Sequence, residues 1–207
     1  FYGEYAGHET DVVLTTRELT RMIRSAHIDP ASLVDRECDP LMKEWTGAGV
    51  IFGTTGGVME AALRSAHYLV TGRNPDPDAF KIVRNPGGQP GVVEAEIQLG
   101  DSTVRAAVVS GLGNTRKLIE AIEHGEVHYD FVEVMACRRG CMAGGGQPVP
   151  IGARTKAARY EGLYRIDDAS QIKRSNDNPI VGELYEGLLK GKEHKLLHNN
   201  SDLPQAK

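Results

Sequence analysis

The stretch FVEVMACRRGCMAGGGQP, residues 131–148, decides how the rest of this chain is understood. It opens with an apolar run typical of a strand, places Cys137 and Cys141 four positions apart, and continues into three glycines at 144–146. Residues four apart lie on the same face of a helical turn, so the spacing predicts two thiolates directed at one object. Glycine has no Cβ, which lets the backbone bend sharply and approach a bulky group. The stretch therefore predicts a soft-metal site between a strand end and a tight turn.

Other interpretations of the two cysteines have to be weighed. Free cysteines are often small buried hydrophobic residues, but the RRG triplet between these two is not typical of a core. Structural zinc usually needs a second pair of Cys or His ligands, and Cys38 lies alone in the charged stretch DRECDP. His194 and His198 are also four apart, in a polar tail where surface exposure is as good an interpretation as ligation.

The ligand count indicates that any iron–sulfur site is incomplete. A cubane normally takes four thiolates, and this chain offers two in a suitable arrangement. The other ligands must then come from a missing segment or from another chain. The N-terminus agrees, because Phe1 is not a start methionine and residues 1–10 resemble a linker that continues an upstream segment. The sequence predicts a processed, split or truncated chain.

Composition excludes several classes of protein. The chain has 207 residues, 40% of them hydrophobic, and a formal net charge of -4, which is ordinary for a globular protein and argues against a nucleic-acid partner. No apolar run approaches the roughly 20 residues that cross a bilayer, and no signal peptide is visible. Three cysteines do not form a disulfide framework, which favours a reducing, cytoplasmic location.

Strand and helix patterns alternate along the chain and predict an α/β fold. After a short β-branched run at 11–14, the elements expected are a helix from a Thr15–Glu18 capping box to residue 26, a hairpin of strands 92–99 and 104–109, a helix at 112–124, a strand at 131–135, and helices at 156–163 and 180–189. The strand at 131–135 is nearly all apolar except for Glu133, which predicts burial on both faces. We expect an α/β cluster-binding lobe at 11–150 and a C-terminal helical segment and tail at 151–207.

A glycine-rich turn connects two apolar segments earlier in the chain. In GAGVIFGTTGGVMEAALR, residues 47–64, Val50, Ile51 and Phe52 indicate a buried apolar edge that leads through residues 53–57 into a helix. We call residues 53–57 the glycine turn. Such a turn can bind an anion at the helix N-terminus, but a simple strand-to-helix connection is the commoner case.

These motifs together resemble the catalytic domain of iron-only (FeFe) hydrogenases. The stretch at 131–148 is similar to the third signature of that family, and the resemblance covers nearly the whole chain in order. It is also carried by DVVLTTRELTRMIR, GAGVIFGTTGGVMEAALR, RSNDNP and EHKLLH. The resemblance implies two α/β lobes with a metal cluster in the cleft between them. This chain would supply most of one lobe and the C-terminal helices.

The resemblance also implies a cofactor and the residues that hold it. In the family the H-cluster joins a 4Fe-4S cubane to a two-iron unit with carbon monoxide, cyanide and azadithiolate ligands. Cys137 matches the cysteine that binds the cubane, and Cys141 the one that binds it and bridges to the two-iron unit. Met135, Ile51 and Phe52 match apolar residues that line the two-iron pocket. Arg138 and Arg139 stand where many relatives carry smaller residues; their charge either raises the cluster's potential or faces solvent.

Two earlier signatures of the family are absent from this chain. One carries the proton-relay cysteine, so the catalytic residues are expected outside this sequence; the other carries a cubane cysteine and a lysine that hydrogen-bonds a cyanide. We therefore expect a part of an iron-only hydrogenase, an oxidoreductase of anaerobic hydrogen metabolism. Its expected partners are an N-terminal segment or subunit and a ferredoxin-like or other redox carrier, with H2 and protons as substrates. The alternatives are a non-catalytic hydrogenase-like protein of cluster assembly and a sensory module.

Overall fold

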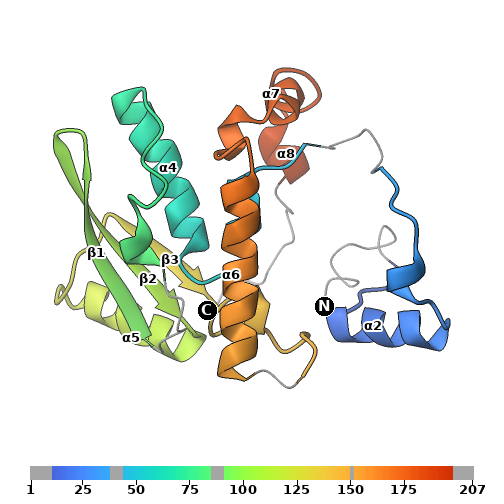
Figure 1. The fold of residues 1–207 in the computed structure, drawn as a ribbon. Helices are drawn as coiled ribbons and strands as arrows, with labels where there is room; N and C mark the ends of the chain where they lie inside the picture. Colours follow the sequence, from blue (N-terminus) through green and yellow to red (C-terminus); the bar gives the residue numbers. More distant parts are fainter. Residues whose placement is uncertain (1–10, 38–43, 85–90, 150–151, 198–207) are drawn as a thin grey trace. The chain divides into compact units, whose positions relative to one another are not determined.

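The computed structural model describes residues 11–37, 44–84, 91–149 and 152–197 (Figure 1). The chain divides into two compact units, one formed by residues 44–178 and the other by the two flanking segments. The predicted linker at 1–10 lies outside the described residues, and the predicted division at residue 150 stays a prediction.

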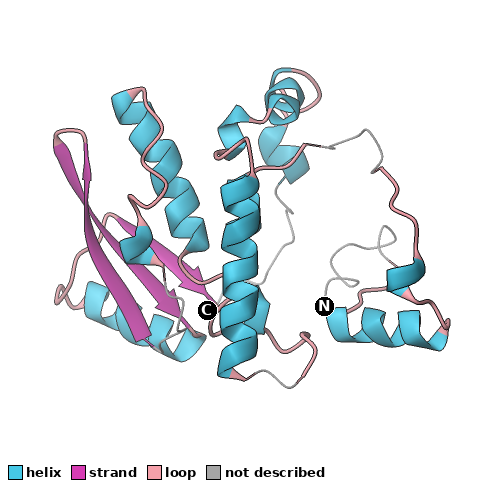
Figure 2. Cartoon of the chain, viewed as in Figure 1, coloured by secondary structure: helices cyan, strands magenta, loops and turns pink. Residues whose placement is uncertain are grey.

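A three-stranded sheet is the centre of the larger unit, as Figure 2 shows in magenta. β1 (Gly91–Leu99) and β2 (Ser102–Ser110) pair antiparallel from Gly91↔Ser110 to Leu99↔Ser102, so the predicted hairpin is confirmed. β3 (Phe131–Met135) pairs with β2 in parallel, starting at Ala106↔Phe131. Parallel neighbours need a crossover, and α5 (Leu112–Glu123) supplies it, which confirms the predicted helix.

Helices cover the sheet because the residues of β2 alternate between two apolar clusters. Ala106 and Val108 pack with Met59 and Leu63 of α4 (Gly57–Thr71) and with the short helix η2 (Lys81–Val83). Ala107 and Val109 pack on the other side against Leu118 of α5. β2 is therefore the central strand, buried on both faces.

The segment before the glycine turn is a helix and not the apolar edge that the sequence predicted. α3 (Gly47–Ile51) begins after Thr46, whose side chain accepts a hydrogen bond from the Gly49 N–H. The helical period directs Ile51 toward the core, where it packs with Ala48, Ala61 and Tyr164. Phe52, one residue later, is 45% exposed. Tyr164 belongs to α6 (Ala153–Ala169), so α3 packs between α4 and α6.

The prediction that β3 is buried on both faces is wrong. Phe131 and Val134 are 40% and 49% exposed, and the one buried side chain of the strand is Glu133, at 5%. These two apolar side chains are exposed because of where β3 lies in the sheet. It is an edge strand of the sheet in the part of the chain that is described.

The smaller unit contains short helices. The capping box that starts α2 (Thr16–Ser25) is confirmed, because Thr15 N–H donates to Glu18 Oε2 at 2.8 Å and Glu18 N–H donates to Thr15 Oγ1 at 3.2 Å. No side chain of α2 is buried. The short β-branched run at 11–14 is not part of a strand. The unit also holds η1 (Pro30–Ser32), α7 (Pro179–Glu186) and α8 (Glu193–Leu197).

Candidate metal centre

The two cysteines lie in the segment after β3, residues 136–149, which we call the cysteine loop. They do not share one helical turn, contrary to the prediction from their spacing. Cys137 precedes a tight turn in which its carbonyl accepts the Gly140 N–H at 3.0 Å, and Cys141 begins the 3₁₀ turn η3 (Cys141–Ala143). Arg139 and Gly140 separate them, with φ of 74° and 80° in the left-handed region, which no helix can continue through. Both thiols are free and exposed.

The glycines that follow bring the backbone close to both cysteines. A Cβ on Gly144 would lie 3.9 Å from Cys137 Sγ and 3.5 Å from the Cys141 carbonyl oxygen. That carbonyl accepts the Gly144 N–H at 3.2 Å and the Gln147 side-chain amide at 3.1 Å. The loop is therefore folded around Gly144 with the two cysteines beside it.

The cysteine loop is seated on the glycine turn. The Met142 N–H donates to the Gly53 carbonyl at 3.0 Å. Gly140 packs so closely there that a Cβ would lie 2.7 Å from the Gly53 oxygen and 2.9 Å from Thr54 Cα. Gly57 has no more room, because a Cβ would lie 1.8 Å from the Ile51 carbonyl oxygen. Close packing therefore explains glycine at both positions.

The Glu133 carboxylate lies at the N-terminus of α4. From the sequence alone, this position could also hold a bound anion. Its Oε1 accepts the Gly56 N–H and its Oε2 the Met59 N–H, each at 2.7 Å. Burial raises the pKa of Glu133, and the backbone N–H groups act in the opposite direction. Because these donors are already used, the structure favours the simple connection between α3 and α4 over a site for a bound anion.

An open cavity of about 360 Å³ adjoins the cysteine loop. Its lining includes Cys141 and Gly53, together with Gly162 and Leu163 of α6. Arg159, also on α6, donates to the Met142 carbonyl at 2.8 Å and to the Pro148 carbonyl at 3.2 Å, so the helix holds the loop at two points. Sequence reasoning missed Arg159, because nothing local distinguishes it from the other arginines of that helix.

The apolar residues expected near the cluster lie in three different environments. Met135 ends β3, is half-buried, and accepts the Gly111 N–H on its carbonyl at 2.8 Å. Ile51 is fully buried in the cluster between α3, α4 and α6. Phe52 is exposed and immediately precedes the glycine turn. Met135 thus directly precedes the cysteine loop, and Phe52 directly precedes the glycine turn. The Ile51 side chain is enclosed by protein.

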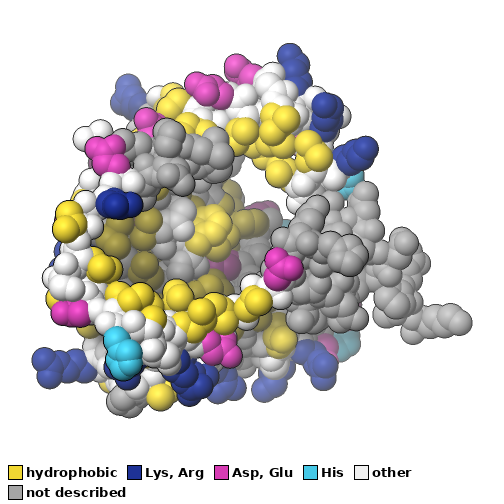
Figure 3. Space-filling model, turned by 90° about the vertical axis from the view of Figure 1, so that its right-hand side faces the viewer, with side chains coloured by type: hydrophobic (Ala, Val, Ile, Leu, Met, Phe, Trp, Pro, Cys, Tyr) yellow, Lys and Arg dark blue, Asp and Glu magenta, His cyan; other side chains and the backbone are white. Residues whose placement is uncertain are grey.

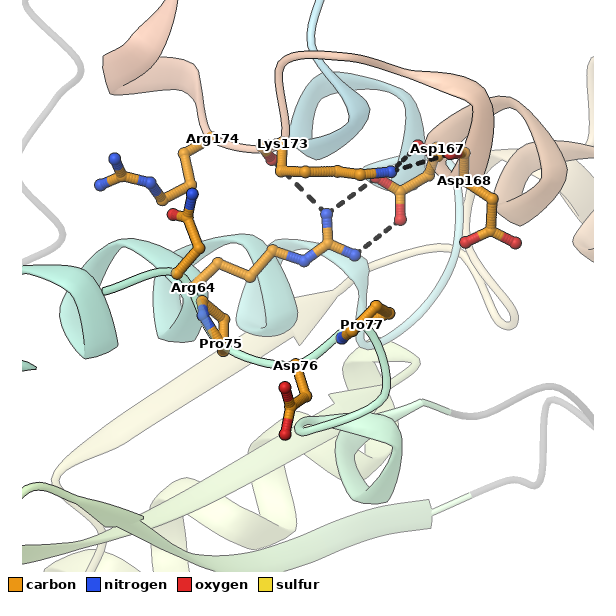
Figure 4. A pocket seen from close by; sticks show the side chains of 9 residues that line it. Arg64, Pro75, Asp76, Pro77, Asp167, Asp168, Lys173 and Arg174 are labelled. Atoms are coloured by element: carbon orange, nitrogen blue, oxygen red, sulfur yellow. Dashed lines mark hydrogen bonds and ion pairs between the residues drawn. The ribbon is translucent and has the colours of Figure 1, made fainter.

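Buried charges join α4 to α6, and Figure 4 shows the part of this network between Arg64 and Asp167. Glu60 accepts hydrogen bonds from Arg64, Arg84 and the Tyr164 hydroxyl, and Arg64 also donates to Asp167. Burial acts to lower the pKa of Arg64, but the hydrogen bond to Asp167 and the charge of Glu60 outweigh it, so the net pKa is above the ordinary value. The guanidinium therefore stays charged. A small cavity of about 60 Å³ lies beside it, lined in part by Asp76 and Lys173.

The donor set fits half of a cubane. Two exposed thiols, an open cavity and a glycine-rich backbone suit a soft, bulky metal group. Among the described residues no group of three or more His, Cys, Asp or Glu side chains is placed to hold a metal ion. Cys38 and His198 lie outside the described residues, and His194 belongs to α8 of the other unit.

Comparison with known proteins places these features in a family. The model of the iron-only hydrogenase large subunit, C-terminal domain, matches residues 2–145, and that of the iron hydrogenase small subunit matches residues 153–200. NADP-reducing hydrogenase subunit HndD of Solidesulfovibrio fructosivorans is 40% identical over 93% of this chain and 33% of its own length. The periplasmic [Fe] hydrogenase large subunit of Nitratidesulfovibrio vulgaris is 47% identical over 76% of this chain and 38% of its own.

More distant sequences and solved structures extend the comparison. A cytosolic Fe-S cluster assembly factor of Xenopus tropicalis is 30% identical over 93% of this chain and 40% of its own length. A variant of FeFe hydrogenase HydA1 from Chlamydomonas reinhardtii matches the fold with a TM-score of 0.68 and 36% identity, over 88% of this chain and 53% of that one. The chain thus spans about a third of the curated hydrogenases it matches and about half of the solved structure.

Proposed function

The chain belongs to the family of the iron-only hydrogenase large subunit, and from this membership we propose that it is the C-terminal part of a catalytic domain that interconverts protons and electrons with H2. The α/β fold of that family's domain is confirmed by the match to solved FeFe hydrogenases. The chain covers only a third of the length of its curated hydrogenase relatives, so we propose the activity for a larger protein that includes this chain.

The observation that carries the proposal is the pair of free, exposed thiols of Cys137 and Cys141 folded around Gly144. Cys137 would bind the 4Fe-4S cubane, and Cys141 would bind the cubane and bridge to the two-iron unit. The two-iron unit would supply the open metal site at which protons and electrons combine. Soft thiolates are the donors that iron–sulfur clusters require.

The remaining parts of the site would come from the N-terminal segment. Two more cubane cysteines, the proton-relay cysteine and the cyanide-binding lysine are all expected there, as is the electron path to a ferredoxin-like or other carrier. Exposed apolar side chains on each of the two units support a covering partner, and Figure 3 draws exposed hydrophobic side chains in yellow. The most exposed are Val34, Leu69, Val12, Leu188 and Val149. Where such side chains are contiguous, exposed apolar surface commonly marks a protein interface.

Met135, Phe52 and Ile51 are proposed to form the apolar wall beside the two-iron unit. A wall of low polarity protects diatomic ligands and tunes the potential of the metal. The environments differ, so the three contributions differ too. Phe52 and Met135 have accessible surface, whereas Ile51 is enclosed and would act by supporting the backbone of the glycine turn.

A cluster-assembly role is the second candidate, because assembly factors are also among the relatives. The higher identity to the hydrogenases, 40% and 47% against 30%, favours catalysis. Anaerobic iron and sulfide analysis with infrared spectroscopy on the full-length protein tests the choice. Carbon monoxide and cyanide stretching bands are expected for a hydrogenase. Iron and sulfide without those bands, after maturation under conditions that load a known hydrogenase, would contradict it.

A cytoplasmic location remains part of the proposal. No helix among the described residues is long and apolar enough to cross a membrane. One relative is named as periplasmic, so the family name alone does not give the compartment.

A further inference from the structure

The burial pattern of β3 reverses what its sequence predicts. Phe131 and Val134 are exposed, Val132 and Met135 are partly buried, and the single buried side chain is the carboxylate of Glu133. Burying a carboxylate is unfavourable unless it is hydrogen-bonded or paired. An edge strand whose most buried side chain is its one acid therefore needs a structural reason.

The reason lies at the start of α4, where the helix lacks a capping side chain of its own. Gly56 is the N-cap residue, with φ of 90°, and offers no side chain to the free N–H groups of the first turn. Glu133 supplies the acceptors from 77 residues away, with one oxygen on the Gly56 N–H and the other on the Met59 N–H. The first turn of a helix also carries partial positive charge, which favours a carboxylate there.

This contact holds one end of the cysteine loop, and a second contact holds the other. Glu133 lies two residues before Met135 and four before Cys137. Beyond Cys137, the Met142 N–H donates to the Gly53 carbonyl at 3.0 Å. The carboxylate and this N–H thus fasten the loop, before and after its cysteines, to the same short glycine turn.

We propose that Glu133 is a positioning residue for the metal cluster, which fixes the Cys137 end of the cysteine loop against the glycine turn. The inference rests on the proposed function, because it assigns to Glu133 the placement of a thiolate that binds the cubane. Groups that orient metal ligands commonly change metal affinity by about 10- to 100-fold when they are removed.

The variant Glu133→Gln isolates this role with little change of shape. The amide keeps one oxygen acceptor and places an N–H2 donor opposite a backbone N–H, so one of the two hydrogen bonds is lost. Glu96→Gln is the matched control, because Glu96 is an exposed carboxylate on β1 of the same sheet. Glu133→Asp keeps the charge on a side chain one methylene shorter, and serves if Glu133→Gln does not fold.

The experiment uses the full-length protein, reconstituted anaerobically with ferrous iron and sulfide. The rate of iron loss to a chelator, the EPR spectrum of the reduced cubane and amide exchange at Gly56 and Met59 are measured for each variant. We expect Glu133→Gln to lose iron about 10-fold faster or more, with a shifted EPR spectrum and faster exchange at both amides. Glu96→Gln should match the wild type in all three.

Two outcomes would overturn the inference, and they are distinguishable. A folded Glu133→Gln protein, or Glu133→Asp in its place, with the wild-type rate of iron loss and the wild-type spectrum would refute the positioning role alone. A wild-type protein that takes up no iron would refute both the proposed function and the inference.

Discussion

The Asp167 carboxylate of α6 accepts hydrogen bonds from both terminal nitrogens of Arg64 of α4, at 2.8 and 2.6 Å. The two residues are 103 positions apart in the sequence. The same guanidinium donates to Glu60 at 2.7 Å, and Glu60 also accepts from Arg84. All four side chains are largely removed from water. Since α6 also carries Arg159, which holds the cysteine loop, this network fixes to α4 the helix that anchors the loop.

Replacing Arg64 should therefore destabilise the fold strongly. Arg64→Met leaves the buried Asp167 carboxylate without its ion partner, and breaking a buried pair in this way costs about 3–5 kcal/mol. Urea denaturation followed by circular dichroism measures the change. Lys81→Ala is the control, because the Lys81–Asp78 pair is exposed and such pairs contribute about 0–1 kcal/mol. Equal losses in the two variants would contradict a buried network.

A methyl group at position 140 should displace the cysteine loop from the glycine turn. Gly140 has φ of 80°, and a Cβ would lie 2.7 Å from the Gly53 carbonyl oxygen. We expect Gly140→Ala to lose about 1–3 kcal/mol of unfolding free energy and to bind less iron on reconstitution. Gly113→Ala is the control, because nothing lies within 4 Å of a Cβ there. It should be neutral or stabilising by up to about 1 kcal/mol in helix α5.

The two arginines between the cysteines should respond in opposite directions to glycine. Arg139 has φ of 74°, which costs an L-residue about 1–2 kcal/mol and costs glycine nothing. Arg139→Gly should therefore raise the unfolding free energy by about 1 kcal/mol. Arg138 is not in this region, and Arg138→Gly should lower stability by about 0.4–1 kcal/mol through the greater freedom of the unfolded chain. Chemical denaturation of both variants checks the sign, and a loss with Arg139→Gly would contradict the account.

The stability of the protein should carry a pH dependence that comes from Glu133. Burial raises the pKa of Glu133 above its ordinary 4.5, while its backbone donors partly offset the shift. Because the folded-state pKa exceeds the unfolded one, the contribution is fully present below the unfolded pKa and is lost as pH rises through the folded pKa. Relative to Glu133→Gln, the wild type should lose unfolding free energy from about pH 4 upward. Parallel stability curves for the two proteins would contradict this assignment.

Local sequence signals predicted much of this fold. The hairpin at 91–110, the capping box at Thr15 and the helix of 112–123 each depend on neighbouring residues, and the structure contains all three. The helix α3 was missed because five residues are too short for a period to be recognised beside a glycine-rich turn. The expected burial of β3 failed because whether a strand is central or at an edge depends on the whole sheet.

The candidate site was only half predictable for the same reason. Cys137 and Cys141 were identified from their spacing and from the glycines that follow them. Their actual arrangement depends on a left-handed turn at Arg139 and Gly140, which a spacing of four does not reveal. The contacts of Glu133 and Arg159 span 77 and 17 positions, so no local pattern marks them. A lone acid in an apolar strand was the one available signal for Glu133.

The most direct test of the central claim is iron content and EPR of the full-length protein after substitution of single cysteines. Cys137→Ala and Cys141→Ala should each lose the signal of the reduced cubane after anaerobic reconstitution, because each removes a thiolate ligand. Cys38→Ala, in the charged stretch DRECDP, should keep it. If both loop variants kept the iron and the spectrum of the wild type, Cys137 and Cys141 would not be the ligands, and the account of this site would be wrong.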